Sequence, residues 1–210
     1  MLTPSCDATP PSFARLPRKV VGTFNRQSFD DVITGEYEGF PFELYEAQLS
    51  YKAGKSTTVA FKGVVIAFGL PASFPGLFVA ARRTNRVNRF FEDLFDRSGL
   101  AELTSGHAGL DETYRFLSDD ERAARALLEG RLAQALGELN ETWPEAPGLV
   151  ALSGADGFVL LPQTKNFFEL PGISVSLDYA AHIQPIVGDL ARLLATAARI
   201  RQAGSADAGG

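Results

Sequence analysis

The stretch from Gly35 to Arg82 limits the possible folds more than any other part of this sequence. It is rich in β-branched and aromatic residues, and short glycine- or proline-containing segments such as Ala53-Gly54-Lys55 divide it. Turns this short join antiparallel strands, because a parallel pair needs a crossover of about a dozen residues or more. The stretch therefore predicts an antiparallel sheet.

Two details of the strand pattern give sharper expectations. The apolar residues of Phe42–Leu49 nearly alternate but slip by one after Leu44, which a bulge between Tyr45 and Glu46 would explain. Further along, two apolar runs flank Ser153-Gly154-Ala155-Asp156, a pattern typical of a hairpin with a tight turn.

Helical spacing of apolar residues appears in three later segments, Val87–Phe95, Ser118–Trp143 and about Tyr179–Gln202. Ser118 and Glu121 predict a capping box at the start of the second. Grouped strands followed by helices indicate an α+β fold, with an antiparallel sheet of about 6–8 strands and two or three helices packed on it. A roll resembling the pleckstrin-homology fold is an alternative for the closure of the sheet.

The length of 210 residues suits one domain. We expect a flexible N-terminal arm over the proline-rich residues 1–17, a single α+β domain over 18–202, and a disordered small-residue tail over 203–210. Cys6 is the only cysteine, the first residues lack the apolar core of a signal peptide, and the apolar runs are too short to cross a bilayer. These features predict a cytoplasmic protein without a transmembrane segment.

Several classes of function are disfavoured by composition and motifs. The net charge of -5 disfavours binding to nucleic acid. Ala53–Thr57 resembles the end of a phosphate-binding loop, but Leu49 occupies the position that needs glycine and strands lie on both sides, so a hairpin turn is favoured. His107 and His182 are the only histidines, and we expect them to be structural or solvated rather than metal ligands. No metal, cofactor or catalytic residue is therefore predicted from a motif.

Carboxylates form the first group of candidate site residues. A close pair could share acid–base work, because proximity separates the two pKa values. Glu43 and Glu46 would face the same side if the bulge exists, and Asp119 is a third candidate. The competing interpretation is the solvent-exposed face of an edge strand for the glutamates and a helix-start residue for Asp119.

A local basic cluster forms the second group. Its four members are Arg82, Arg83, Arg86 and Arg89. Arginine forks bind phosphate or carboxylate well, so the cluster could contact a lipid head group, another anion or a protein partner. The competing interpretation is an ordinary charged helix face.

Four sequence pieces, in this order, resemble a known bacterial family. They are Gly35–Gly39 with Phe42–Glu46, Phe61–Gly63 with Leu70-Pro71, Tyr114–Leu128, and Asp156-Gly157 before a strand. Together they are similar to the family catalogued as domain of unknown function 3137, over about Val32–Arg199. The resemblance implies a domain without an assigned reaction. It also implies relatives with transmembrane helices before this domain, from which this chain departs.

We favour a cytoplasmic binding or scaffold module over an enzyme. The partner would be an unidentified protein or small ligand, and the chain could be a monomer or a homodimer. Two alternatives remain open: a carboxylate-based enzyme, and a peripheral membrane protein that binds anionic head groups.

Overall fold

The computed structural model describes residues 3–5, 9–83, 99–143, 148–163, 167–168 and 178–203. Within them seven strands form one antiparallel sheet in the order β1-β2-β3-β4-β6-β5, and β7 also pairs with β4. The predicted α+β class and strand number are confirmed, and the sheet is open rather than closed into a barrel. None of the helices described is long and apolar enough to span a bilayer.

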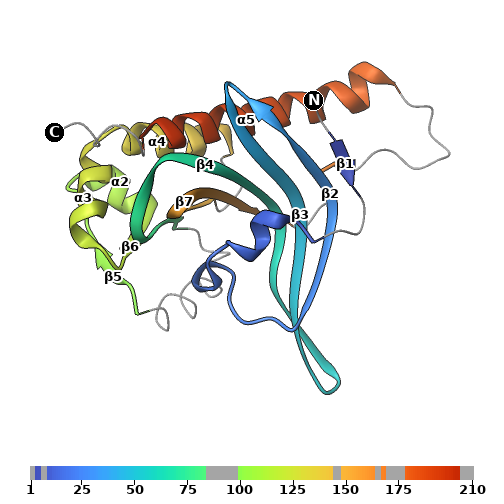
Figure 1. The fold of residues 1–210 in the computed structure, drawn as a ribbon, viewed down its shortest axis with the longest axis horizontal. Coiled ribbons are helices and arrows are strands. Elements are labelled where there is room, and N and C mark those ends of the chain that lie inside the picture. Colours follow the sequence, from blue (N-terminus) through green and yellow to red (C-terminus); the bar gives the residue numbers. More distant parts are fainter. Residues whose placement is uncertain are drawn as a thin grey trace.

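The elements follow one another along the chain as shown in Figure 1. The strands are β1 (Thr3–Ser5), β2 (Arg26–Tyr37), β3 (Phe40–Ala53), β4 (Ser56–Arg82), β5 (Ala101–Leu103), β6 (Tyr114–Ser118) and β7 (Leu149–Pro162). The helices are η1 (Pro11–Ala14), η2 (Arg18–Val20), α2 (Ala108–Thr113), α3 (Glu121–Glu129), α4 (Leu132–Thr142), η3 (Tyr179–Ile183) and α5 (Gln184–Ala203).

The long strand β4 organises the sheet. Its first half pairs with β3, its second half pairs with β6, and β7 pairs with both halves. The register between β4 and β7 shifts twice between Gly69 and Leu77, where the strand bends. Gly154 of β7, with a φ of 56°, lies opposite this bend. The turn predicted at Ser153–Asp156 is therefore wrong, because these residues follow the bend within one continuous strand.

Both faces of the sheet are buried. Helices α3, α4 and α5 pack on one face, over side chains such as Phe78 and Phe116. The N-terminal segment with η1 and η2 packs on the other face, where Phe13 and Leu16 are buried. A flexible arm was predicted for residues 1–17, but from Phe13 onward that segment lies against the sheet because its apolar side chains cover strand residues.

The helices differ from the predicted pattern in one place. The single helix expected over Ser118–Trp143 is two helices, α3 and α4, separated at Gly130. The predicted capping box is wrong, because Asp120 Oδ1 accepts from Ala123 N at 3.0 Å while Ser118 Oγ donates to the Leu77 carbonyl at 2.9 Å. The last predicted helix is present as a π-helical turn, η3, followed by α5. The helix predicted over Val87–Phe95 lies outside the described residues.

Candidate functional site

The two candidate glutamates of β3 lie on opposite faces of the sheet. Tyr45 and Glu46 pair regularly with Val65 and Val64 of β4, so the predicted bulge between them is wrong. The irregularity lies on β2, where two residues, Asp31 and Val32, face the single Tyr45. Alternation could not reveal this register, because apolar residues of β3 are buried on both faces. Consequently Glu43 and Glu46 do not form an acid–base pair.

Glu43 lies on the face covered by the N-terminal segment. It is 9% exposed, and its Oε2 accepts a hydrogen bond from the Ser12 backbone N–H at 2.7 Å. Nearby, Arg15 Nε donates to Asp156 Oδ2 at 2.9 Å. That hydrogen bond is the main reason that the pKa of Arg15 is raised above its usual range. We call these four residues, Ser12, Arg15, Glu43 and Asp156, the N-terminal latch, because they hold the segment against the sheet.

A buried pair of hydroxyls lies beside the latch. Tyr45 is fully buried, and burial raises its pKa far above the usual range, while the neighbouring Ser12 hydroxyl and Arg15 act in the opposite direction. Neither the Tyr45 nor the Ser12 hydroxyl reaches a hydrogen bond of good geometry with any described residue. A serine, a tyrosine and a glutamate thus lie close together, but Ser12 is only 1% exposed.

Glu46 lies on the helix-covered face and also binds backbone. Its Oε1 accepts from Phe167 N at 2.5 Å and from Phe168 N at 3.2 Å. The Phe167 ring packs against the rings of Phe168 and Trp143. Glu46 therefore fixes a distant segment of the chain against β3.

Glu46 is also part of a carboxylate group that its strand pattern alone did not indicate. Asp30 of β2 lies directly opposite Glu46, and Asp31 follows at the bulge with a φ of 50°. Burial is the main cause of the raised pKa of Glu46, and Asp31 and Asp30 raise it further, while the two backbone N–H groups lower it. Burial and Asp30 likewise raise the pKa of Asp31. The structure thus brings Glu46 together with Asp30 and Asp31 rather than with Glu43.

The raised pKa of Glu46 predicts a pH-dependent effect of Glu46→Gln. A carboxyl group with a higher pKa in the folded than in the unfolded state stabilises the fold at low pH, and this contribution is lost as the pH rises through the folded-state pKa. Glutamine keeps an acceptor for Phe167 and Phe168 without the charge. We therefore expect the free energy of unfolding of Glu46→Gln, relative to wild type, to increase between about pH 4 and 7.

Urea unfolding at a series of pH values measures this difference. Added salt should reduce the part that comes from Asp30 and Asp31, because salt screens charge repulsion, and should leave the part that comes from burial. A variant whose relative stability falls as the pH rises would show that the charged carboxylate is favoured in the fold.

Asp119 is the third candidate carboxylate, and it too binds backbone. Its Oδ1 accepts from Leu77 N at 2.6 Å, and Asp119 N donates to the Leu77 carbonyl at 3.3 Å. A Cβ on Gly76 would overlap the Asp119 carboxylate, so glycine is required beside it. Asp119 therefore holds the end of the β4 bend, and the neighbouring Asp120 caps the helix.

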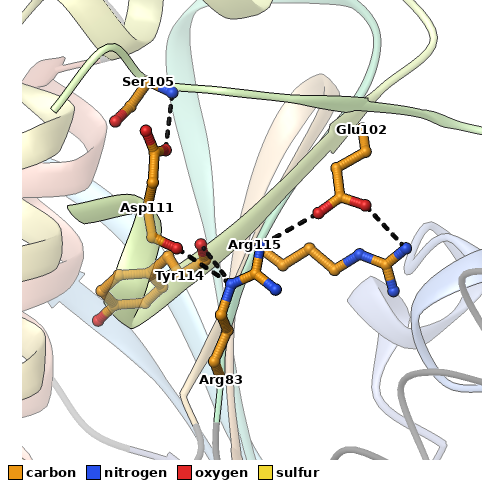
Figure 2. Close-up of polar contacts among 6 residues, drawn as sticks. All are labelled: Arg83, Glu102, Ser105, Asp111, Tyr114 and Arg115. Atoms are coloured by element: carbon orange, nitrogen blue, oxygen red, sulfur yellow. Dashed lines mark hydrogen bonds and ion pairs between the residues drawn. The ribbon is translucent and has the colours of Figure 1, made fainter. Parts of the chain in front are cut away.

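Arg83 of the arginine cluster belongs to a network of polar contacts at the end of β4 (Figure 2). Arg83 Nε donates to the carbonyls of Asp111 and Tyr114 at 3.1 and 3.2 Å. Its Nη2 lies 3.1 Å from Glu102 Oε1, and the other Glu102 oxygen pairs with Arg115 at 3.0 Å. This network ties the end of β4 to β5, α2 and β6.

Of the three remaining arginines of the cluster, the structure describes one. Arg82 Nη1 donates to the Trp143 carbonyl at 3.0 Å, so it joins the end of β4 to the end of α4. Arg86 and Arg89 lie outside the described residues. The structure therefore assigns backbone and carboxylate partners to half of the predicted cluster.

The histidines take part in local backbone structure. The His107 carbonyl accepts from Ser105 Oγ at 3.3 Å just before α2, and His182 Nδ1 accepts from Asp178 N at 2.9 Å in η3. Across the described part of the chain, no group of three or more histidine, cysteine, aspartate or glutamate residues is placed to hold a metal ion.

The latch residues Arg15 and Asp156 were missed by sequence reasoning. They are 141 positions apart, and the patterns that include Asp156 gave no sign of a partner in the N-terminal segment. No local signal in the sequence could have paired them, because a contact of this kind depends on the path of the whole sheet.

Comparison with known proteins identified a family model that matches this chain and a solved structure with a similar fold. The family model described as "Protein of unknown function (DUF3137)" matches residues 59–200. No curated protein matches the chain. The crystal structure of the mycobacterial trehalose monomycolate transport factor A, TtfA, is similar, with a TM-score of 0.54 and 14% identity. The similarity covers 95% of this chain and 83% of that one, and at this identity it concerns the fold alone.

Proposed function

The chain belongs to the DUF3137 family of proteins of unknown function, and we propose that it is a binding or scaffold module of the bacterial cytoplasm rather than an enzyme. One observation carries the proposal. Each carboxylate that the sequence offered for acid–base work, Glu43, Glu46 and Asp119, accepts hydrogen bonds from backbone N–H groups of a distant segment. Such contacts stabilise a rigid framework and leave these oxygens without a role in turnover.

The similar solved structure fits this proposal. That protein is described as a transport factor, and we carry over to this chain only the idea that its role is binding. A framework with both sheet faces covered suits a scaffold, because partners can then bind at its edges and loops without any rearrangement of the core.

We further propose that the arginine cluster divides into two roles. Arg82 and Arg83 hold carbonyls and Glu102, so their substitution would act through the fold. Arg86 and Arg89 remain the members that we assign to a protein partner or an anionic ligand, since arginine is favoured at the centre of such contacts.

The double variant Arg86→Glu/Arg89→Glu tests this assignment. With the full chain as bait in a native bacterial lysate that includes membranes, we expect a reproducible partner, and we expect the variant to capture at least about tenfold less of it. The matched control is Arg122→Glu/Arg131→Glu, which makes the same charge change at exposed positions on α3 and before α4. Equal loss in both variants would contradict a specific role for Arg86 and Arg89.

A carboxylate-based enzyme is the second candidate function, and we propose for it a group of residues other than the pair Glu43 and Glu46. Asp30 and Asp31 lie beside Glu46, and the pKa values of Asp31 and Glu46 are raised, mainly by burial, which is a feature of carboxylates that transfer protons. Assays on a broad panel of esters, phosphates and glycosides test both functions. Turnover that is lost in Glu46→Gln would overturn the binding module, and absence of turnover across the panel would support it.

A further inference from the structure

The hairpin between β3 and β4 projects beyond the body of the sheet (Figure 1). Every residue from Tyr51 to Val59 is exposed. The turn is short, with Ala53 paired to Ser56 and a φ of 59° at Gly54 between them. The side chains of this hairpin do not contribute to the core, so they are available for contacts with other molecules.

The base of the projection is braced. Asn25 Nδ2 donates to the Lys52 carbonyl at 2.9 Å, Lys52 N donates to Asn25 Oδ1 at 2.8 Å, and Asn25 N donates to the Ser50 carbonyl at 3.0 Å. Through these three hydrogen bonds Asn25 occupies one edge of β3 at Ser50 and Lys52, while β4 pairs with the other edge. The tip is therefore presented in a fixed orientation.

The tip is basic within an acidic protein. The chain as a whole has 25 acidic and 20 basic residues, yet no aspartate or glutamate occurs between Glu46 and Glu92. By register, Arg26, Lys52 and Lys62 share one face of the ribbon, and Lys55 lies in the turn. All four are exposed, and none forms an ion pair with another described residue.

Apolar side chains accompany these cations. Four large hydrophobic side chains are exposed among the described residues, and two of them, Tyr51 at 45% and Val59 at 52%, lie on this hairpin. Tyr51 pairs with Thr58, and Val59 pairs with Ser50, so the two side chains point to opposite faces of the ribbon. A flat protein surface would cover only one of them.

We propose that the tip of the β3–β4 hairpin docks end-on into the surface of an anionic lipid bilayer. Insertion into a fluid head-group layer would bury Tyr51 and Val59 together, and tyrosine is favoured at that depth. The four residues on each side of the turn reach roughly 13 Å, which is enough to cross the head groups. Lys52 and Lys55, nearest the turn, would then lie among the lipid phosphates, and Arg26 and Lys62, further back along the ribbon, would face the bilayer surface.

Charge argues for lipid rather than nucleic acid. The narrow tip carries only a few cations, and the rest of the acidic chain would be repelled by a long polyanion, whereas end-on docking keeps most of the protein away from the bilayer. This inference concerns a different segment of the chain from the arginine cluster and does not depend on the protein partner proposed above.

Sedimentation with vesicles of phosphatidylcholine and phosphatidylglycerol tests the inference. Each lysine near an anionic surface strengthens partitioning about fivefold, so Lys52→Gln/Lys55→Gln should weaken it roughly 25-fold. Wild type should bind weakly to pure phosphatidylcholine, and high salt should release it from the anionic vesicles. The matched control is Arg122→Gln/Arg131→Gln, with the same change in net charge on helices that Figure 1 places far from the hairpin.

A Tyr51→Trp variant reports on insertion directly. Its fluorescence should be quenched by brominated lipids in the anionic vesicles, whereas that of Trp143 in the wild type should not. Circular dichroism confirms that each variant is folded. Absence of wild-type binding at low salt, or equal loss of binding in the lysine and control variants, would overturn the proposal.

Discussion

Replacement of Gly63 with alanine should lower the free energy of unfolding by about 3 to 4 kcal/mol. Gly63 lies in the centre of the sheet, between Ala47 of β3 and Pro162 of β7. A Cβ at this position would overlap the Leu161 carbonyl oxygen and lie 2.8 Å from Gln163 N. Both obstacles are backbone atoms, so relief requires a shift of β7 itself, and the φ of 152° adds strain.

Thermal unfolding measures the effect, since a loss of this size corresponds to a fall in Tm of roughly 10 °C in a chain of this length. Gly137→Ala is the matched control. A Cβ on Gly137 would meet nothing within 4 Å, and the residue lies inside α4. The free energy of unfolding of Gly137→Ala should rise by about 0.5 to 1 kcal/mol, because alanine favours the helix more than glycine does. If Gly63→Ala had the same Tm as the wild type, β7 would not approach β4 as closely as the structure shows.

Much of the sheet could be predicted because its signals are local. The β-branched residues and short turns between Gly35 and Arg82 indicated antiparallel strands, and β3 and β4 follow them, whereas most of β2 lies before this stretch. The glycine and lysine of the segment that resembles a phosphate-binding loop form the hairpin turn expected there. The final helix followed the spacing of apolar residues from Tyr179 onward.

The errors arose where a distant contact decides the local structure. Ser118 could not cap the helix, because its hydroxyl binds the Leu77 carbonyl across the sheet. Gly154 lies within a continuous strand because β4 bends opposite it. The slip after Leu44 reflects burial on both faces of β3, and not a bulge in β3 itself. None of these partners is near in sequence.

The same reason limits the prediction of the site. The sequence could select Glu43, Glu46 and Asp119 as carboxylates of interest, but their roles depend on Ser12, Phe167 and Leu77, which supply the N–H donors. Residue type predicted the possible chemistry, and long-range register determines what each carboxylate binds. The N-terminal latch is the clearest case, since its residues Arg15 and Asp156 are 141 positions apart.

Replacement of Glu43 with alanine should therefore release the N-terminal latch. The Ser12 N–H would lose its acceptor in a buried place, and Arg15 would lose a neighbouring negative charge. We expect a loss of about 2 to 3 kcal/mol in the free energy of unfolding. Limited proteolysis should also cut the first residues of the chain faster than in the wild type. The control is Glu36→Ala at an exposed position on β2, which should stay within about 0.5 kcal/mol of wild type.

The conservative variant Glu43→Gln separates a latch from a proton-transfer role. The glutamine side-chain oxygen can still accept from the Ser12 N–H, so a latch predicts that Glu43→Gln is clearly more stable than Glu43→Ala and more resistant to proteolysis. A proton-transfer role predicts that both variants lose any activity equally, because neither can exchange a proton. Equal stability of the two variants would mean that the Ser12 hydrogen bond contributes little. In that case the packing of Phe13 and Leu16 alone would hold the segment on the sheet.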